Sequence, residues 1–512
     1  MNFSAPRALV AGVLAAAAGM AAGHLAAGLT RPEASPVPAV GSAVIDRTPT
    51  PVKEWAVRTL GTWDKPVLLG SVSLVTLLLA ATAGLLARRR PLAGVALLVL
   101  LSAVAGAAAL NRPAADGQYV LPSVVTAVVG CAVLLALLPA RFRVPGRATE
   151  LSAYPSGMDT RRGFLLGTGT VAAASVGAAA FGQHLTGGDP SSDVRLPQAA
   201  RTEPALPRGL EPTYRDISSL RTPNQGFYRV DTALVVPRVK ADTWELRIDG
   251  DVRRPYTLTY DDIRAMPLIE RDITMTCVSN EVGGQYVGAA RWLGVRVADL
   301  LRHAEVVDPG RPGRQVLSRS VDGFTVSTPL GALTDDRDAL LAIGMNGAPL
   351  PATHGFPARL VTPGLYGFVG STKWVTRLTV TTYDAARAYW TRRGWATDAP
   401  VKPSARIDTP ASLASLPPGT VTIGGVAWAQ RHGVVRVEVS IDDGPWRPAT
   451  LGPDVGVDYW RQWVLKADLG GTGRHSIRAR VTDGRGQVQN DERAPVFPSG
   501  SSGIQEVVVL VG

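Results

Sequence analysis

Cys277 is the residue of this 512-residue chain whose type and position most clearly suggest chemistry. It lies in the segment T-M-T-C-V-S-N-E-V-G-G, whereas the other cysteine, Cys131, falls within a long apolar run. We therefore expect no disulfide, which leaves three roles for Cys277: a buried apolar filler, a reactive thiol or a metal ligand. Free cysteines are most often fillers, so the neighbouring residues must decide.

The loop after this cysteine is polar and rich in glycine. Asn280 and Glu281 come first, followed by Gly283, Gly284 and Gly288. Glycines here would let the backbone approach a bulky ligand closely, although simple loop flexibility explains them equally well.

A second polar block lies about 75 residues further on and reads M-N-G-A-P-L-P-A-T-H-G-F-P-A-R-L-V-T-P-G-L-Y-G-F-V-G-S-T-K-W. It contains His354, Arg359, Ser371 and Lys373. The planar fork of an arginine suits bidentate binding of phosphate. His354 taken alone is more often a loop or core histidine than a ligand, so the whole block must carry the argument.

Both blocks resemble conserved motifs of the sulfite oxidase family of molybdopterin enzymes. In that family a strand ends in a cysteine that is soon followed by Asn and, after a loop, by A-x-W-x-G-V-x-L-x-D-L-L. The second block is similar to the family pattern N-G-x-P-L-P-x-x-H-G-x-P-x-R-x-x-x-P-G-x-x-G-x-x-x-x-K-W. The residues that match the first motif are Cys277, Asn280, Ala290, Trp292, Gly294, Val295, Asp299, Leu300 and Leu301.

The resemblance implies a molybdenum cofactor whose metal is bound by the Cys277 thiolate. Coordination removes the thiol proton, and a soft sulfur suits a metal already held by a dithiolene. Arg359 would meet the pterin phosphate and Lys373 would supply a second cation. The cofactor-binding residues that the resemblance implies are Asn224, Asn280, Cys277, His354, Arg359, Ser371 and Lys373. A heme is not expected, because the sequence contains no C-x-x-C-H motif and no b5-like segment.

The sequence departs from the family pattern next to the cysteine. Sulfite-oxidising members carry A-G-N-R-R after it, whereas this chain has V-S-N-E-V-G-G. Glu281 thus replaces an arginine, and a carboxylate there disfavours a dianion such as sulfite. We predict that Glu281 and Tyr286 face the substrate, and that Asn224 and Arg229 of T-P-N-Q-G-F-Y-R-V-D serve the pterin or the substrate.

The first 185 residues are dominated by long uncharged apolar runs, which indicate a five-helix membrane anchor. Arginines cluster between the second and third runs and between the fourth and fifth, so both connections should be cytoplasmic. The N-terminus is then cytoplasmic, and the region after the fifth span is extracytoplasmic on a multi-pass protein of the cell membrane. The predicted spans are about 7–29, 66–87, 91–110, 119–140 and 163–183.

The segment T-R-R-G-F-L-L-G before the fifth span resembles a twin-arginine signal, which exports proteins that are already folded. Arg161 and Arg162 would be the paired arginines. Alternatively, these two arginines simply follow the positive-inside rule. Both interpretations place the rest of the chain outside.

The formal charge of +11 does not indicate a nucleic-acid partner. Only 6 of the 53 basic residues are lysines, and many arginines flank the apolar runs. The remainder of the chain carries no Lys/Arg block and no RNA-binding aromatic motif.

The polar part of the chain divides into a linker and two domains. Residues 186–215, rich in Pro, Ser and Gly, are predicted to be a linker, and residues 216–400 a mixed α+β cofactor domain. Its expected strands include W-E-L-R-I-D-G and A-L-V-V-P-R-V, and its expected helices include L-T-Y-D-D-I-R-A-M and V-R-V-A-D-L-L-R-H-A. A Pro-rich joint is expected at about 398–418.

Residues 401–512 alternate short strands with Asp/Gly turns, which indicates an all-β sandwich of roughly seven strands. This part is similar to the immunoglobulin-like domain that follows the molybdenum domain in the family and often mediates dimerisation, so a homodimer is expected. Its tryptophans are predicted to pack in the sandwich core. They are Trp428, Trp446, Trp460 and Trp463.

The favoured hypothesis is a membrane-anchored molybdopterin-dependent oxidoreductase that transfers an oxygen atom to or from a small molecule and exchanges electrons with an unidentified redox partner. A reductase of sulfoxides, including methionine sulfoxide, is the alternative within the same class. A binding module that has lost the cofactor is the alternative outside it.

Overall fold

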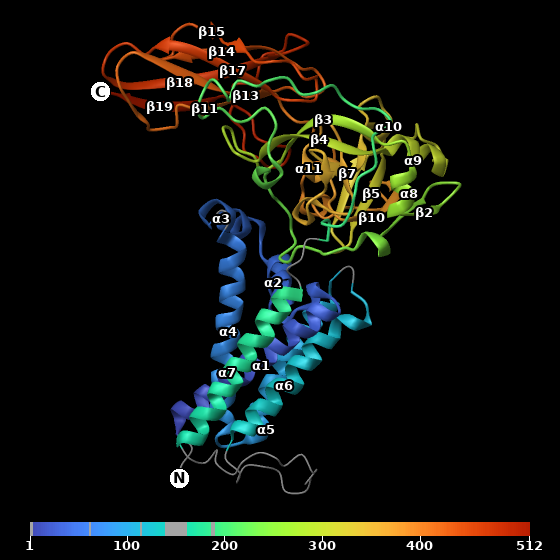
Figure 1. The fold of residues 1–512 in the computed structure, drawn as a ribbon, viewed down its shortest axis with the longest axis vertical. Coiled ribbons are helices and arrows are strands. Elements are labelled where there is room, and N and C mark those ends of the chain that lie inside the picture. The colour runs from blue at the N-terminus through green and yellow to red at the C-terminus, as the bar shows by residue number, and fades with distance from the viewer. Residues whose placement is uncertain (1–3, 61–62, 113–114, 139–160, 186–189) are drawn as a thin grey trace. The chain divides into compact units, whose positions relative to one another are not determined.

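The computed structural model describes residues 4–60, 63–112, 115–138, 161–185 and 190–512, and the chain forms two compact units (Figure 1). One unit comprises residues 1–188 with 232–237, and the other comprises 189–231 with 238–512. Each unit is considered by itself.

The first unit is helical. Five of its helices are long and apolar enough to cross a membrane, and they lie where the hydropathy pattern predicts spans. Two further helices, α2 and α3, follow the first of these and were not predicted, because they are short and contain charged residues. The helices are α1 (Ala5–Leu29), α2 (Pro36–Arg47), α3 (Thr50–Leu60), α4 (Asp64–Ala87), α5 (Pro91–Leu110), α6 (Leu121–Leu137) and α7 (Arg161–Leu185).

Glycines let α1 and α4 approach each other closely. A Cβ atom on Gly84 would lie 2.0 Å from the carbonyl oxygen of Ala8, and one on Gly12 would lie 2.0 Å from that of Ala80. Close approach through small residues is a common way for apolar helices to associate. Gly70, also in α4, has no atom within 4 Å of its Cβ position.

We expect Gly84→Ala to loosen the α1–α4 contact, since the new methyl group would collide with backbone that cannot rotate away. Overpacking of this kind destabilises by about 1–3 kcal/mol. The measurement is the fraction of detergent-solubilised protein that stays monodisperse after graded heating. Gly70→Ala is the matched control and should behave as wild type; equal behaviour of the two variants would contradict the observed contact.

The paired arginines of the twin-arginine segment cannot be assessed from the structure. Thr160 and residues 139–159 lie outside the described residues, as does the end of the predicted span at 139–140. The side chains of Arg161 and Arg162 likewise lie outside what is described. The export signal stays a prediction.

The stretch predicted as a linker, 186–215, is not a free connection where the structure describes it. The Ala200 amide donates to the Leu268 carbonyl at 2.8 Å, and the Glu203 amide donates to the Glu270 carboxylate at 3.0 Å. Further on, the Leu210 amide donates to Gln462 at 2.8 Å. The linker prediction is wrong from about residue 194 onward, because polar composition does not reveal that a segment has docking partners elsewhere in the chain.

Asp338 is the anchor of this docked segment. Its carboxylate accepts from Arg201 at 2.6 Å and from Arg271 Nε at 2.9 Å, and Arg296 Nε lies 2.8 Å away. Burial alone would raise the pKa of Asp338, but the hydrogen bonds and charges of these arginines lower it. Asp338 thereby links the segment at Arg201 to the chain segments that carry Arg271 and Arg296.

We expect Asp338→Asn to destabilise the protein by about 3 kcal/mol at pH 7, since the partly buried Arg271 and Arg296 and the half-exposed Arg201 would lose a buried carboxylate. Because the pKa of Asp338 is lower in the folded protein than in the unfolded chain, its ionised carboxylate stabilises the folded state at pH values above the unfolded pKa of about 3.9. This stabilisation is lost as the pH falls through the folded-state pKa. The difference between wild type and variant should therefore shrink in acid, as measured by unfolding temperature across pH.

The matched control for this change is Asp261→Asn. Asp261 pairs with Arg264 at 3.0 Å, but 86% of its side chain is exposed, so the loss should stay within about 1 kcal/mol. A loss at Asp338 no larger than at Asp261 would contradict the anchoring role.

One mixed and one antiparallel sheet form the centre of the second unit and share one apolar core that includes Trp292, Ile248 and Leu341. The first sheet has the order β2-β1-β10-β5-β6, with bounds Tyr256–Thr259, Glu245–Gly250, Val375–Thr382, Arg314–Ser320 and Thr325–Pro329. The second has the order β3-β4-β7-β8, with β9 also paired to β7. Its bounds are Ile269–Thr276, Val287–Arg296, Leu340–Met345, Ala348–Pro349 and Arg359–Val361.

Short helices connect these strands. Both predicted helices are present, as α8 (Tyr260–Ala265) and α9 (Val297–Ala304), and α8 begins with a capping box between Thr259 and Asp262. The others are α10 (Leu330–Thr334) and α11 (Gly367–Gly370). The strand expected in A-L-V-V-P-R-V is absent, because residues 232–237 group with the helical unit and Pro237 has no amide hydrogen to pair.

The C-terminal part is β-rich and consists of two sheets whose facing residues form a common core around Trp463, Val439 and Ile477. It has nine strands among the described residues rather than seven, and the predicted joint at 398–418 contains two of them, β11 and β12. The immunoglobulin-like assignment stays a prediction.

One sheet of the C-terminal part has the order β11-β13-β17-β16 (Ser404–Thr409, Thr420–Trp428, Arg461–Asp468, Thr450–Leu451). The other has the order β12-β19-β18-β14-β15 (Ser415–Leu416, Gln505–Val511, Gly473–Asp483, Val434–Ile441, Arg447–Pro448).

Only one of the four predicted core tryptophans, Trp463, packs between these sheets. Trp428 and Trp460 instead belong to an apolar cluster shared with the central domain. Trp446 is half-buried, and the Arg480 guanidinium lies 4.2 Å from its ring. Core burial is confirmed for Trp428, Trp460 and Trp463 and is wrong for Trp446, but only Trp463 lies between the two sheets, because a strand pattern shows which side chains are buried and not what buries them.

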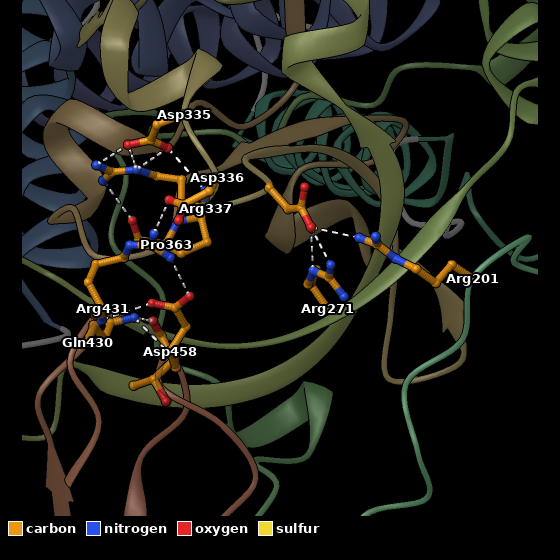
Figure 2. Close-up of polar contacts among 11 residues, drawn as sticks. Arg201, Arg271, Asp335, Asp336, Arg337, Pro363, Gln430, Arg431 and Asp458 are labelled. Carbon is orange, nitrogen blue, oxygen red and sulfur yellow. Dashed lines mark hydrogen bonds and ion pairs between the residues drawn. The ribbon is translucent and has the colours of Figure 1, made fainter. Parts of the chain in front are cut away.

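Polar contacts reinforce this shared boundary. Arg431 pairs with Asp458 at 3.0 Å and with Asp336 at 2.6 Å, while the neighbouring Arg337 donates to the carbonyl of Pro363 at 3.1 Å (Figure 2). The central and C-terminal parts are therefore joined into one unit by both apolar and charged contacts.

Candidate functional site

Cys277 lies directly after β3, where the β3–β4 hairpin opens into its loop. The register pairs Thr276 with Val287, and the Cys277 amide continues it by donating to the Tyr286 carbonyl at 2.9 Å. The thiol is half-buried. Strand pairing therefore fixes the backbone of this cysteine, while the residue as a whole is only partly covered.

The loop after the cysteine is held by Asn280, which is only 5% exposed. Its amide donates to the Cys277 carbonyl at 3.0 Å, and its side-chain oxygen accepts from the Tyr286 amide at 2.8 Å. The Ser501 hydroxyl donates to the Asn280 carbonyl at 2.7 Å. Asn280, predicted to bind the cofactor, thus shapes the turn, and nothing in the sequence signalled the contribution of Ser501.

The Cys277 sulfur lies 2.9 Å from the Ser279 hydroxyl oxygen. Burial raises the pKa of the Cys277 thiol, and the hydrogen bond with Ser279 and the charge of Lys373 oppose that rise. Lys373 therefore acts electrostatically on the sulfur, although it is almost a hundred residues away in the chain. The structure brings together the two sequence blocks that resemble the family motifs.

Aromatic rings line the space beside the cysteine. Phe227 stacks on Tyr228 with ring centroids 5.2 Å apart and meets Trp292 edge-on at 5.9 Å. Tyr228 lies 6.4 Å from Tyr286, the residue predicted to face the substrate. Burial raises the pKa of the Tyr228 phenol, so this hydroxyl stays protonated. Sequence reasoning missed both aromatic residues, although F-Y stands inside the quoted upstream block.

His354 is a neutral, positioning histidine. Burial and the nearby Arg359 lower its pKa to about 4. Its Nε2 lies 2.9 Å from the Asn224 carbonyl, so Nε2 carries the proton and donates. The Asn224 side chain is itself engaged, since it donates to the Met345 carbonyl at 3.2 Å and accepts from Asn346 at 2.7 Å. Both predicted residues brace the upstream segment against the second block.

Arg359 is a cation buried without a carboxylate. Its side chain donates to the His354 carbonyl at 3.0 Å and to the Ser371 hydroxyl at 2.6 Å, and it lies 5.1 Å from the Trp292 ring. No described carboxylate contacts it, and its buried Nε has no partner among the described residues. Burial lowers the pKa of Arg359 to about 10. A charge left in this state is unfavourable unless an anion joins it.

Lys373 is paired with a carboxylate of the upstream block. Its ammonium pairs with Asp231 at 2.7 Å, and Asp231 also accepts from Arg229 at 2.9 Å. Burial lowers the pKa of Lys373 to about 8, and Asp231 opposes that shift. The last residue of T-P-N-Q-G-F-Y-R-V-D thus folds back onto this cation, and its role as the second cation for the cofactor stays a prediction.

Glu281 lies apart from the buried cations. Its side chain is exposed and lines a small polar cleft with Lys402, Ser501 and Thr276. The two residues predicted to face the substrate therefore lie in different surroundings. Tyr286 lies beside Tyr228, whereas Glu281 faces the C-terminal part.

The three loop glycines also differ from expectation. A Cβ on Gly284 would lie 2.6 Å from the Asn280 side chain, one on Gly288 would lie 2.9 Å from the Phe227 ring, and one on Gly283 would lie 2.7 Å from Gln505. They make room for protein side chains rather than for a bulky ligand. Tight packing of the loop, invisible in the sequence, explains their presence.

The residues present fit a molybdopterin cofactor in two respects. Cys277 offers a soft sulfur on a half-buried residue, and Arg359 offers a buried guanidinium with an unused donor that suits a phosphate. Ser371 fixes that guanidinium, and the aromatic residues exclude water around it.

Comparison with known proteins agrees with this geometry. The family described as "Oxidoreductase molybdopterin binding domain" matches residues 233–390. Sulfite oxidase of Gallus gallus is 29% identical over 325 residues, covering 54% of this chain and 69% of that protein. Mitochondrial sulfite oxidase of Homo sapiens is 30% identical over 365 residues, covering 60% of this chain and 65% of that protein. The crystal structure of sulfane dehydrogenase SoxCD from Paracoccus pantotrophus aligns at 22% identity with a TM-score of 0.49, covering 63% of this chain and 95% of that chain.

The fold and these matches define a molybdopterin-binding oxidoreductase. More closely, the matches support the sulfite oxidase family of molybdopterin oxidoreductases, to whose members this chain is similar. The chain spans about two thirds of the length of the animal sulfite oxidases that it matches.

We expect Arg359→Gln to reduce molybdopterin retention roughly ten- to hundredfold, because charge-assisted hydrogen bonds contribute about 1.5–3 kcal/mol. Arg359→Lys should give an intermediate loss, since a lysine keeps the charge but not the planar fork. The measurement is pterin and molybdenum per mole of purified protein. Arg254→Gln, which removes an exposed arginine of the same domain, is the control, and retention by Arg359→Gln equal to this control would contradict the role.

Proposed function

We propose that this protein is a membrane-anchored, molybdopterin-dependent oxidoreductase that transfers an oxygen atom to or from a small substrate outside the cytoplasm. One observation supports this most strongly: a half-buried cysteine at a strand end feels the charge of the buried Lys373, and the nearby buried guanidinium of Arg359 has no carboxylate partner among the described residues. The family assignment supplies the chemistry that such a pair would serve.

The proposed roles follow from the contacts. Cys277 would bind the metal, Arg359 with Ser371 would bind the pterin phosphate, and His354 would hold Arg359 and the upstream segment in place. When bound, the cofactor supplies two-electron oxygen-atom transfer. Tyr228 and Tyr286 would contact the substrate from the aromatic side of the site.

The overall reaction balances in either direction. In oxidation, water supplies the oxygen atom, and two protons and two electrons leave the site; in reduction, the substrate loses its oxygen as water and the same number of protons and electrons enter. The electrons would pass singly to or from a protein redox partner. That partner is part of the proposal, as is dimerisation through the C-terminal part.

The proposed location is supported by two observations. Five helices of the first unit are long and apolar enough to span a membrane, and the arginines of the sequence lie in the connections expected to be cytoplasmic. With the N-terminus cytoplasmic, five spans leave residues after 185 on the outer side.

Charge distribution makes a neutral sulfoxide the second candidate substrate beside sulfite. Arg359 is buried, Lys373 is neutralised by Asp231, and the exposed residue next to the cysteine turn is Glu281, so little free positive charge faces a dianion. Tyr228 and Tyr286 provide an aromatic surface and hydroxyl donors suited to a neutral molecule. Assays with sulfite plus an electron acceptor, and with sulfoxides plus a reduced dye, distinguish the two.

We expect protein produced in a molybdopterin-competent host to contain about one molybdenum per chain, and Cys277→Ser to abolish turnover while leaving folding nearly intact. A hydroxyl is a much poorer ligand than a thiolate for a soft metal site. Metal analysis, dye-linked activity and unfolding temperature are the measurements. Cys131→Ser, in α6, is the matched control and should retain metal and activity.

Two outcomes would contradict the proposal. Wild-type protein without molybdenum would indicate a binding module that has lost the cofactor. Full activity of Cys277→Ser would remove the proposed metal ligand.

A further inference from the structure

We propose that Ser279 is a positioning residue that donates a hydrogen bond to the metal-binding sulfur of Cys277 and thereby sets the reduction potential of the site. The inference rests on the proposed function, because it concerns the sulfur that would bind the metal. It goes further by assigning a tuning role to a residue of the V-S-N-E segment that the family motif does not assign.

The observation is a contact between two side chains of one turn. Ser279 Oγ lies 2.9 Å from Cys277 Sγ, and it is the one side chain that hydrogen-bonds this sulfur among the described residues. Lys373, the nearby cation, is already engaged by Asp231 at 2.7 Å and by the Thr353 carbonyl at 3.3 Å. The hydroxyl is therefore the direct polar neighbour of the sulfur, and the lysine acts only through its field.

The direction of this hydrogen bond is decided by the chemistry of ligation. In the free thiol either atom can donate. A sulfur bound to a metal has lost its proton, so it can only accept, and Ser279 must then be the donor. Metal binding therefore turns an ambiguous contact into a charge-assisted one, which is the stronger kind.

The turn keeps the hydroxyl in place. Val278, on one side of Ser279, is buried in the apolar cluster shared with the C-terminal part. Asn280, on the other side, is held through its carbonyl by Ser501 and through its side-chain oxygen by the Tyr286 amide. With both neighbours fixed, Ser279 cannot move away from the sulfur without disturbing the packing of the loop.

A donor at a metal-bound sulfur changes the electronics of the metal. The hydrogen bond draws electron density from the sulfur and weakens its donation, which favours the reduced metal and raises the reduction potential. A serine that merely filled space or capped a turn would not have this effect. The reduction potential therefore separates the tuning role from a structural one.

The test compares variants of the full-length, molybdenum-loaded protein in detergent. Ser279→Ala removes the donor, Ser279→Thr keeps a hydroxyl, and Ser501→Ala loosens the same turn without touching the sulfur. The midpoint potential of the metal is measured by spectroelectrochemical titration, with molybdenum content and unfolding temperature recorded for each protein. We expect a lower potential in Ser279→Ala and wild-type potentials in the other two.

An unchanged potential in a fully loaded Ser279→Ala protein would overturn the inference, as would an equal shift in Ser501→Ala. Should Ser279→Ala fail to load, Ser279→Val removes the donor while filling the volume, and its potential should then lie below that of wild type; a wild-type value would overturn the inference. Wild-type protein without molybdenum would instead refute the proposed function, so the two failures are distinguishable.

Discussion

The site depends on how strand β3 is held, because this strand delivers Cys277. On one side β3 pairs with β4 along its whole length, and the pairing continues through the Cys277 amide to Tyr286. On the other side the Thr274 amide donates to the Asp458 carbonyl at 2.9 Å, and the Trp460 amide donates to the Thr274 hydroxyl at 2.8 Å. The central domain and the C-terminal part thus both hold β3 in place, and together they fix the position of Cys277.

Electrostatics provide the second constraint. Among the described residues the cluster contains two buried cations, Lys373 and Arg359, and the exposed Arg229, with Asp231 as their carboxylate partner, and His354 is held neutral. Because charges in a low-dielectric interior are unfavourable unless they are paired, an excess of buried cations favours the binding of an anionic ligand. The same arrangement leaves little free positive charge at the surface. Buried cations can therefore favour an anionic cofactor without favouring an anionic substrate.

Part of the central domain could be predicted from the sequence: the two expected helices and the strand in W-E-L-R-I-D-G carry strong local patterns and are present, whereas the strand expected in A-L-V-V-P-R-V is absent. The pairing of Asp231 with Lys373 and of Ser501 with Asn280 could not, because these residues are more than a hundred positions apart and no local pattern links them. The supposed linker failed for the same reason: its composition is polar, yet Arg201 meets Asp338 across 137 positions. The tryptophans of the C-terminal part were recognised as buried, but whether Trp463 or Trp460 faces the sheet core depends on a neighbouring domain.

The sequence by itself determined the kind of chemistry, because residue types and short spacings select it: a lone polar-region cysteine, an arginine-bearing second block and five apolar runs are all local features. Only the tertiary structure decided how those residues act. Folding neutralises Lys373 but leaves Arg359 without a carboxylate, turns Glu281 toward the C-terminal part and places the Ser279 hydroxyl against the sulfur. The physical reason is that charge compensation, desolvation and hydrogen-bond direction depend on distances in space, which the order of residues along a chain does not contain.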